Sequence, residues 1–280
     1  MKRVKTMTHS SVLQSLFLAG LILASAGAQA AVLPRITVTG VVGNSVYNVN
    51  GYTGSIAYDP SAWFGKSFTL ELVVDAANTV KTTEPFGDIP GEFNTWQPIT
   101  VDYRLTINGA LALSGTDNRY SRIESFNNIT VPADLTGLEA PPGIIGARTY
   151  DGYVVGASDI QLACFSGGTN NKCDGEPTDV YEGASIIFDY FWDTALHDAI
   201  VSANLPDPLG LDFTQGFGGA DFNFWHYSQA AGGGDDIARI YLSATSVTVT
   251  PVPEAETYAM MLAGLGLVGW AARRRRTIRK

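Results

Sequence analysis

The chain of 280 residues is 45% hydrophobic and carries a net charge of −9. Nine of its 18 Lys and Arg residues lie within the first five or the last eleven positions. Residues 31–253 therefore keep nine basic residues against 25 acidic ones, a net charge of about −16. A surface this acidic repels nucleic acid and anionic lipid, which excludes a nucleic-acid-binding protein. The length suffices for one large β domain or two small ones.

The N-terminus has the three parts of a secretory signal peptide. Three basic residues lie among the first five, an apolar core follows at residues 12–24, and small residues end with Ala28 and Ala30. This order predicts export through the Sec machinery and cleavage after Ala30. The alternative is an uncleaved anchor, but an apolar core of about 13 residues is too short to favour one. Residues 1–30 are thus predicted to be a signal peptide.

The C-terminus predicts a short membrane helix closed by positive charge. Residues 258–272 carry no charge, and they are followed by Arg273, Arg274, Arg275 and Arg276. As a helix, this stretch spans roughly 22 Å, less than a hydrocarbon core of about 30 Å, although arginines can snorkel and the bilayer can thin. A packed core helix would instead be amphipathic, and this stretch is apolar all round. Because basic clusters stay on the cytoplasmic side, we expect a transient inner-membrane anchor with the body of the chain outside.

The residues at this end resemble a known sorting signal. Val252, Pro253 and Glu254 precede the apolar stretch and the arginine cluster. The order is similar to the PEP-CTERM signal of Gram-negative bacteria that make exopolysaccharide, except that Ala255 replaces the usual second proline. The resemblance implies processing by an exosortase and a final location at the cell surface or outside the cell. It covers about the last 25 residues and implies nothing about the activity of the rest.

The middle of the chain predicts many short strands. Asn108-Gly109 between two alternating runs is a strong hairpin signal, because both residues tolerate positive φ. The longest alternating run, residues 237–249, predicts a central or near-central strand. Other strands are predicted at residues 35–42, 67–74, 99–107, 123–131, 152–164, 184–192 and 220–227.

This pattern favours a mostly β fold, a β-sandwich of jelly-roll type. The domain division is then a signal peptide at residues 1–30, an ectodomain at 31–250 and a sorting signal at 251–280. Residues 195–205 predict one short helix ended by Pro206. Residues 250–253 are expected to form a brief extended linker, and the segment at residues 232–236 is expected to be a mobile loop.

The two cysteines, Cys164 and Cys173, flank a loop rich in Gly and Asn. In an oxidising compartment they predict a disulfide. The alternative is a metal site, which would need further Cys or His residues nearby.

Residues that could support catalysis or metal binding are sparse. The exported part has two histidines, His197 and His226, and neither a G-x-S-x-G nor an H-E-x-x-H sequence. Calcium is an open possibility, because oxygen-rich segments occur at Asp117-Asn118, between Asn170 and Glu176, and at Asp235-Asp236. None matches the EF-hand pattern, so no cofactor is predicted and no metal ligand is assigned.

Two tryptophans are candidates for glycan contact. Trp63 and Trp96 lie in turn-rich segments, so we expect their rings to be exposed rather than packed in the core.

The sequence thus favours a non-catalytic surface or extracellular-matrix protein that is processed by an exosortase and associated with exopolysaccharide or a biofilm. One alternative is a calcium-assisted carbohydrate-binding module. Another is a secreted hydrolase.

Overall fold

The computed structural model describes residues 32–47, 60–84, 91–131, 148–166, 180–201, 204–228, 233–253 and 262–266. The chain divides into two compact units. One comprises Pro34–Val252, and the other comprises the two ends of the chain, Met1–Leu33 and Pro253–Lys280. The predicted signal peptide lies outside the described residues.

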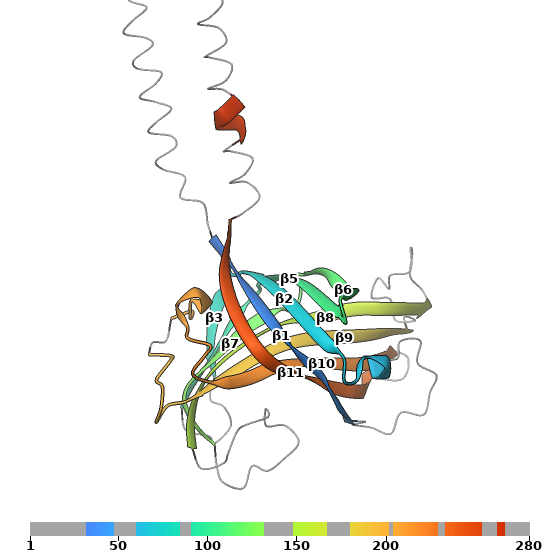
Figure 1. Cartoon of the computed structure of the whole chain (residues 1–280), viewed down its shortest axis with the longest axis horizontal. Coiled ribbons are helices and arrows are strands. Elements are labelled where there is room, and N and C mark those ends of the chain that lie inside the picture. The colour runs from blue at the N-terminus through green and yellow to red at the C-terminus, as the bar shows by residue number, and fades with distance from the viewer. Residues whose placement is uncertain are drawn as a thin grey trace, which may run out of the picture. The chain divides into compact units, whose positions relative to one another are not determined.

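The larger unit is built from one antiparallel sheet whose strands run in the order β3-β4-β7-β8-β9-β10-β11-β1-β2-β5-β6 (Figure 1). The strands and two short 3₁₀ helices are β1 (Val32–Tyr47), η1 (Pro60–Trp63), β2 (Ser67–Asp75), β3 (Val80–Glu84), β4 (Glu92–Gln97), β5 (Thr100–Ile107), β6 (Ala110–Asp117), β7 (Arg122–Val131), β8 (Arg148–Ser166), β9 (Val180–Asp193), η2 (Pro208–Gly210), β10 (Phe217–Ser228) and β11 (Gly233–Pro253).

Alternation of side chains explains why these segments form strands with one buried face. In β2, Phe68, Leu70, Leu72 and Val74 are buried, and the residues between them are partly exposed. Successive side chains of a strand point to opposite faces, so such a segment must cover its apolar face.

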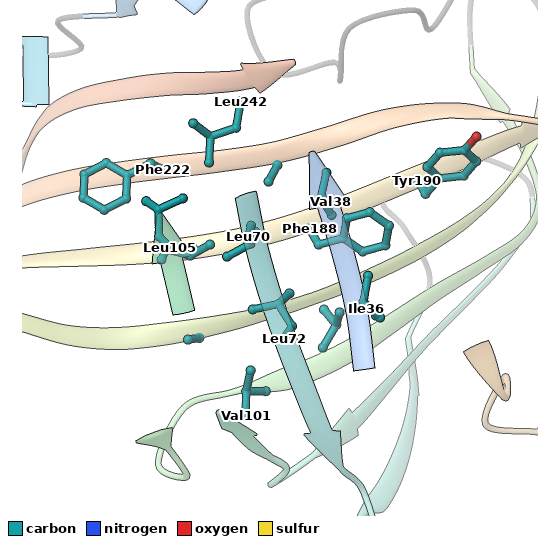
Figure 2. Packing of buried hydrophobic residues seen from close by; sticks show 14 of the residues in the cluster. Ile36, Val38, Leu70, Leu72, Val101, Leu105, Phe188, Tyr190, Phe222 and Leu242 are labelled. Atoms are coloured by element: carbon teal, nitrogen blue, oxygen red, sulfur yellow. The ribbon is translucent and has the colours of Figure 1, made fainter. Parts of the chain in front are cut away.

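The sheet covers its apolar face by folding over itself. β1, β2 and β5 cross over β8, β9 and β10, and their inward side chains meet in one core (Figure 2). Leu70 and Leu105 from the first group lie with Phe188, Phe222 and other large side chains from the second. The mostly β prediction is confirmed, and one continuous sheet forms both layers of the sandwich.

β11 is the strand that joins the two layers. Its first half pairs with β10, up to Ser243 opposite Gly219, and the whole strand curves toward β1 (Figure 1). Its place between β10 and β1 confirms the predicted central position. The expected linker at residues 250–253 is wrong, because β11 continues to Pro253. The expected loop at residues 232–236 is also wrong from Gly233 onward, because β11 begins there.

The hairpin predicted from Asn108-Gly109 is confirmed as the turn between β5 and β6. Asn108 has φ 49° and Gly109 has φ 80°, the left-handed values that a two-residue hairpin turn of this kind needs. β3 and β4 were not predicted.

The predicted helix at residues 195–205 is wrong for the described residues 195–201. A single turn forms, in which Leu196 and His197 donate their backbone N–H to the Asp193 carbonyl. Further along the segment, the N–H groups of Ala199 and Ile200 donate instead to the Asp151 carboxylate at 2.8 and 2.9 Å. A distant side chain therefore takes the donors that a helix would use.

A second, smaller apolar cluster lies on the opposite face of the sheet. Phe93, Phe126, Phe191 and Phe217 lie in register across β4, β7, β9 and β10, with Gly152 of β8 between the middle two. Successive ring centroids are 5.0, 5.9 and 6.1 Å apart. We call these four rings the aromatic row. Because the rings pack on one another, the row is explained as part of the packing of the sheet.

Candidate functional site

The residues that carry the sorting resemblance begin inside the last strand. Val252 and Pro253 are the final residues of β11, and both are partly buried. Glu254 and the four arginines from Arg273 to Arg276 lie outside the described residues. The folded β domain therefore reaches the sorting residues with no intervening spacer.

Contacts with β1 hold this part of β11. Thr245 Oγ1 donates to the Thr39 carbonyl at 3.1 Å. The Ser243 carbonyl oxygen lies so close to Gly40 that a Cβ there would be 1.9 Å from it. Glycine at position 40 is therefore required for the close approach of the two strands. Because Gly40 faces Ser243 and Gly43 faces Tyr241, β1 and β11 run antiparallel.

Beyond the strand, residues 262–266 form a helical turn in which Leu262 and Leu265 are 65% and 61% exposed. Within the described ranges, no helix has the length and apolar character needed to cross a membrane. Most of the predicted membrane helix at residues 258–272 lies outside those ranges.

The two tryptophan candidates differ from expectation. Trp96 is 4% exposed and belongs to the main core, with the Lys81 ammonium 5.7 Å from its ring centroid. Its expected exposure is wrong, because the turn-like segment around it is strand β4. Trp63 is partly buried and packs edge-on against Phe222, with 5.2 Å between ring centroids. Both rings therefore contribute to packing.

The two histidines lie on separate elements. His197 follows β9, and its charge helps to lower the pKa of Asp212, after the larger effect of two hydrogen bonds from Thr214. His226 lies in β10, opposite Glu182 of β9 and Asp235 of β11 in backbone register. The Thr214 bonds account for most of the shift at Asp212.

Asp117, a candidate calcium ligand, has a structural role. Its carboxylate accepts from the Arg119 N–H at 3.0 Å, the Ser121 hydroxyl at 2.6 Å and the Ser158 N–H at 2.7 Å. These bonds connect the end of β6 to β8, and they occupy the oxygens that a cation would need. The candidates at Asn170–Glu176 lie outside the described residues. Among the residues that are described, no group of three or more acidic, Cys or His side chains gathers as a metal site would require.

Asp151 is a second buried carboxylate that sequence reasoning missed. Besides the N–H groups of Ala199 and Ile200, it accepts the N–H of Asn128 at 2.9 Å. Asn128 has φ 54° and lies in the register shift of β7. Burial raises the pKa of Asp151, and these three hydrogen bonds act in the opposite direction. The side chain thus connects the bulge in β7 to the segment after β9. No local sequence pattern predicts this contact, because its partners are far apart in the chain.

The predicted disulfide is only partly within the described residues. Cys164 lies in β8 opposite Tyr181 of β9 in backbone register, and Cys173 lies outside the described ranges. The pairing stays a prediction.

A scan of protein families finds the PEP-CTERM protein-sorting motif at residues 251–276. No curated protein and no solved structure matches the chain. The motif identifies an exported protein that passes through the membrane, is processed by an exosortase and reaches the cell surface. It overlaps the last three residues of β11.

Proposed function

With the PEP-CTERM motif as the premise, we propose that this is a non-catalytic surface or extracellular-matrix protein associated with exopolysaccharide. One observation carries the proposal: the sorting motif directly continues an acidic β domain. Exosortase processing removes the anchor and leaves that domain as the mature protein, outside the inner membrane.

The chemistry of the described domain supports a structural role. The buried carboxylates Asp117 and Asp151 each accept three hydrogen bonds from the protein, so they act as internal braces. Trp96 is buried in the main core, and Trp63 is partly buried against Phe222. The net charge of about −16 keeps the domain soluble and disfavours direct binding to anionic surfaces.

Strand composition adds a further argument for a durable structural part. β8, β9 and β10 carry large aromatic side chains on both faces of the sheet: Tyr153, Phe188 and Phe222 in the main core, and Tyr150, Phe191 and Phe217 on the opposite face. Burial on both faces gives a sheet that resists local opening. This property suits a protein that remains outside the cell without repair.

Fractionation of cells with and without the exosortase tests the proposal. The wild-type strain is expected to carry the shortened protein in the surface and exopolysaccharide fractions, and the exosortase deletion strain to retain the full-length form in the inner membrane. Deleting the gene for this protein should alter the cohesion of the exopolysaccharide layer. A processed protein that is absent from that layer, together with unchanged cohesion, would refute the matrix role while leaving the sorting intact.

A further inference from the structure

A pocket of about 410 Å³ lies where the edge strand β3 and the end of β4 meet the turn between β6 and β7. Its lining residues are Val80 and Thr82 of β3, Gln97 and Pro98 at the end of β4, and Arg119 of the turn. All five are exposed. Ligand pockets have volumes of roughly 300–1,000 Å³, so this one has room for a small molecule or for one unit of a polymer.

The register explains why the side chains of the pocket face away from the main core. Val80 pairs with Gln97, and Lys81 pairs with Trp96, which is buried in the core. Because successive side chains of a strand point to opposite faces, Val80, Thr82 and Gln97 lie on the face opposite to Trp96. The pocket therefore opens on the face of the sheet that also carries the aromatic row.

Hydrogen bonds fix the turn that carries Arg119. The Asp117 carboxylate accepts the Arg119 N–H at 3.0 Å and the Ser121 hydroxyl at 2.6 Å. The Ser121 carbonyl accepts the N–H of Ile99, the residue after Pro98, at 3.3 Å. Ser121 and Ile99 are both buried. The turn and the end of β4, which form two walls of the pocket, are therefore held together before any ligand binds.

Arg119 is the one charged residue of the five that line the pocket. Its guanidinium lies 5.5 Å from the ring centroid of Tyr120, and it forms no ion pair with any residue that the structure describes. The nearby Arg122, by contrast, pairs with Glu124. An unpaired cation in a domain with a net charge of about −16 indicates a place for an anionic group.

We propose that this pocket binds one carboxylated sugar unit of the exopolysaccharide. The inference rests on the proposed association of the protein with exopolysaccharide. The planar guanidinium of Arg119 binds a carboxylate through two parallel hydrogen bonds. The Gln97 amide and the Thr82 hydroxyl supply donors and acceptors for sugar hydroxyls, and Val80 and Pro98 supply apolar surface for the C–H groups of the ring.

The acidic surface of the domain limits contact with an acidic polymer to this pocket. Repulsion between exposed charges is screened beyond about 8 Å at physiological salt, whereas the bond to the guanidinium forms at contact. A single open pocket binds one sugar unit weakly. A polymer with many such units holds many copies of the protein, so weak single contacts are enough for a stable layer.

Binding of the purified mature protein to polygalacturonate, a polymer of carboxylated sugars, tests the site. Arg119→Gln should weaken this binding about tenfold, through loss of the charge-assisted hydrogen bonds. Arg104→Gln is the matched control, because it removes the same charge outside the pocket and leaves Glu71 paired with Arg35. The control should change binding by about twofold at most. Wild-type binding by Arg119→Gln, equal losses in both variants, or no binding by the wild-type protein would overturn the proposal.

Two further polymers test the class of ligand. Dextran offers sugar hydroxyls without carboxylates, and polyglutamate offers carboxylates without sugars. Both should bind the wild-type protein about tenfold more weakly than polygalacturonate, because each lacks half of the proposed contacts. Binding of either polymer as tight as that of polygalacturonate would overturn the assignment to a carboxylated sugar.

Fractionation of a strain that makes Arg119→Gln separates this inference from the proposed function. The variant should be processed normally and should move from the exopolysaccharide fraction to the medium. Retention of the variant at the wild-type level would overturn the pocket as the point of contact and leave the matrix role standing. Absence of the wild-type protein from the exopolysaccharide fraction would refute the proposed function, while the polygalacturonate measurement would still decide the pocket.

Discussion

Single buried carboxylates hold together parts of this domain that lie far apart in the sequence. Asp117 connects the end of β6 to Ser158 of β8, and Asp151 connects the bulge at Asn128 to the segment at Ala199. In each case the carboxylate accepts hydrogen bonds from backbone N–H groups at irregular positions of the chain. Buried donors without acceptors are costly, so these residues are expected to have large effects on stability.

Asp151→Asn should lower the free energy of unfolding by about 1–3 kcal/mol, because an amide NH₂ would face N–H donors in place of one carboxylate oxygen. Urea unfolding of the exported domain measures the effect. Asp102→Asn, at an exposed position of β5 bonded to Thr116, is the control and should change stability by less than about 0.5 kcal/mol. Equal effects of the two substitutions would contradict the bracing role of Asp151.

Tyr153 and Ser125 give a prediction of the opposite sign. The two residues pair across β7 and β8, both are fully buried, and neither hydroxyl has a hydrogen-bond partner among the residues that the structure describes. Burial raises the pKa of Tyr153, so its hydroxyl stays protonated at neutral pH. Removing an unpaired buried hydroxyl eliminates a desolvation cost, so Tyr153→Phe should leave stability unchanged or raise it by about 1 kcal/mol.

Tyr190→Phe is the comparison for Tyr153→Phe. The Tyr190 hydroxyl donates to the Phe213 carbonyl, so its loss should cost about 1 kcal/mol. Thermal unfolding of both variants under one set of conditions measures the difference. If Tyr153→Phe proved the more destabilising of the two, its hydroxyl must have a partner in solution.

At the scale of strands, predictions succeeded where the signal is local. The β5–β6 hairpin follows from Asn108-Gly109, and β11 follows from an alternating run that is longer than the run of β10. β3 and β4 escaped prediction because polar residues such as Asn94 occupy inward positions there.

Failures at this scale come from long-range contacts. The helix expected after Asp193 is prevented by the carboxylate of Asp151, and Trp96 is buried by strands that the sequence does not place beside it. The sorting site could be predicted because its parts follow one another along the chain. The braces at Asp117 and Asp151 could not, because their partners meet only when the sheet folds over itself.

The aromatic row makes one strand position intolerant of even a methyl group. A Cβ on Gly152 would lie 2.7 Å from the Phe191 ring and 2.8 Å from the Phe126 ring, so both rings would have to move. Gly152→Ala should destabilise the domain by about 1–3 kcal/mol through overpacking. Gly210→Ala is the control, because no atom lies within 4 Å of the added Cβ there. Equal free energies of unfolding for the two variants in chemical denaturation would contradict the close packing of the aromatic row around Gly152.

At the scale of the whole molecule, the sequence predicts that the two ends of the chain direct its location and that the β domain is the part that remains there. The middle of the chain is acidic, and the two ends are basic. Basic clusters stay on the cytoplasmic side of the membrane, and here they lie only in the two segments that are predicted to be removed. The PEP-CTERM motif at residues 251–276 supports this division for the C-terminus. The motif begins within β11, so its first three residues belong to the folded sheet.

The arginine cluster should act as the stop that holds the unprocessed precursor. Replacing Arg273, Arg274, Arg275 and Arg276 by Gln in a strain without the exosortase should release protein from the inner membrane, because the short apolar stretch alone anchors weakly. The fraction of protein in the periplasm and medium measures this release. Full retention of the Gln variant would show that the apolar stretch is sufficient as an anchor.

Mass spectrometry of the two termini of the mature protein, purified from strains with and without the exosortase, tests the account most directly. With the exosortase, the protein should begin at Ala31 and should lack the arginine cluster at residues 273–276. Without it, the same N-terminus should be joined to an intact C-terminus ending at Lys280. Recovery of the complete polypeptide, with both ends uncut, from the cytosol of the exosortase-bearing strain would contradict the account.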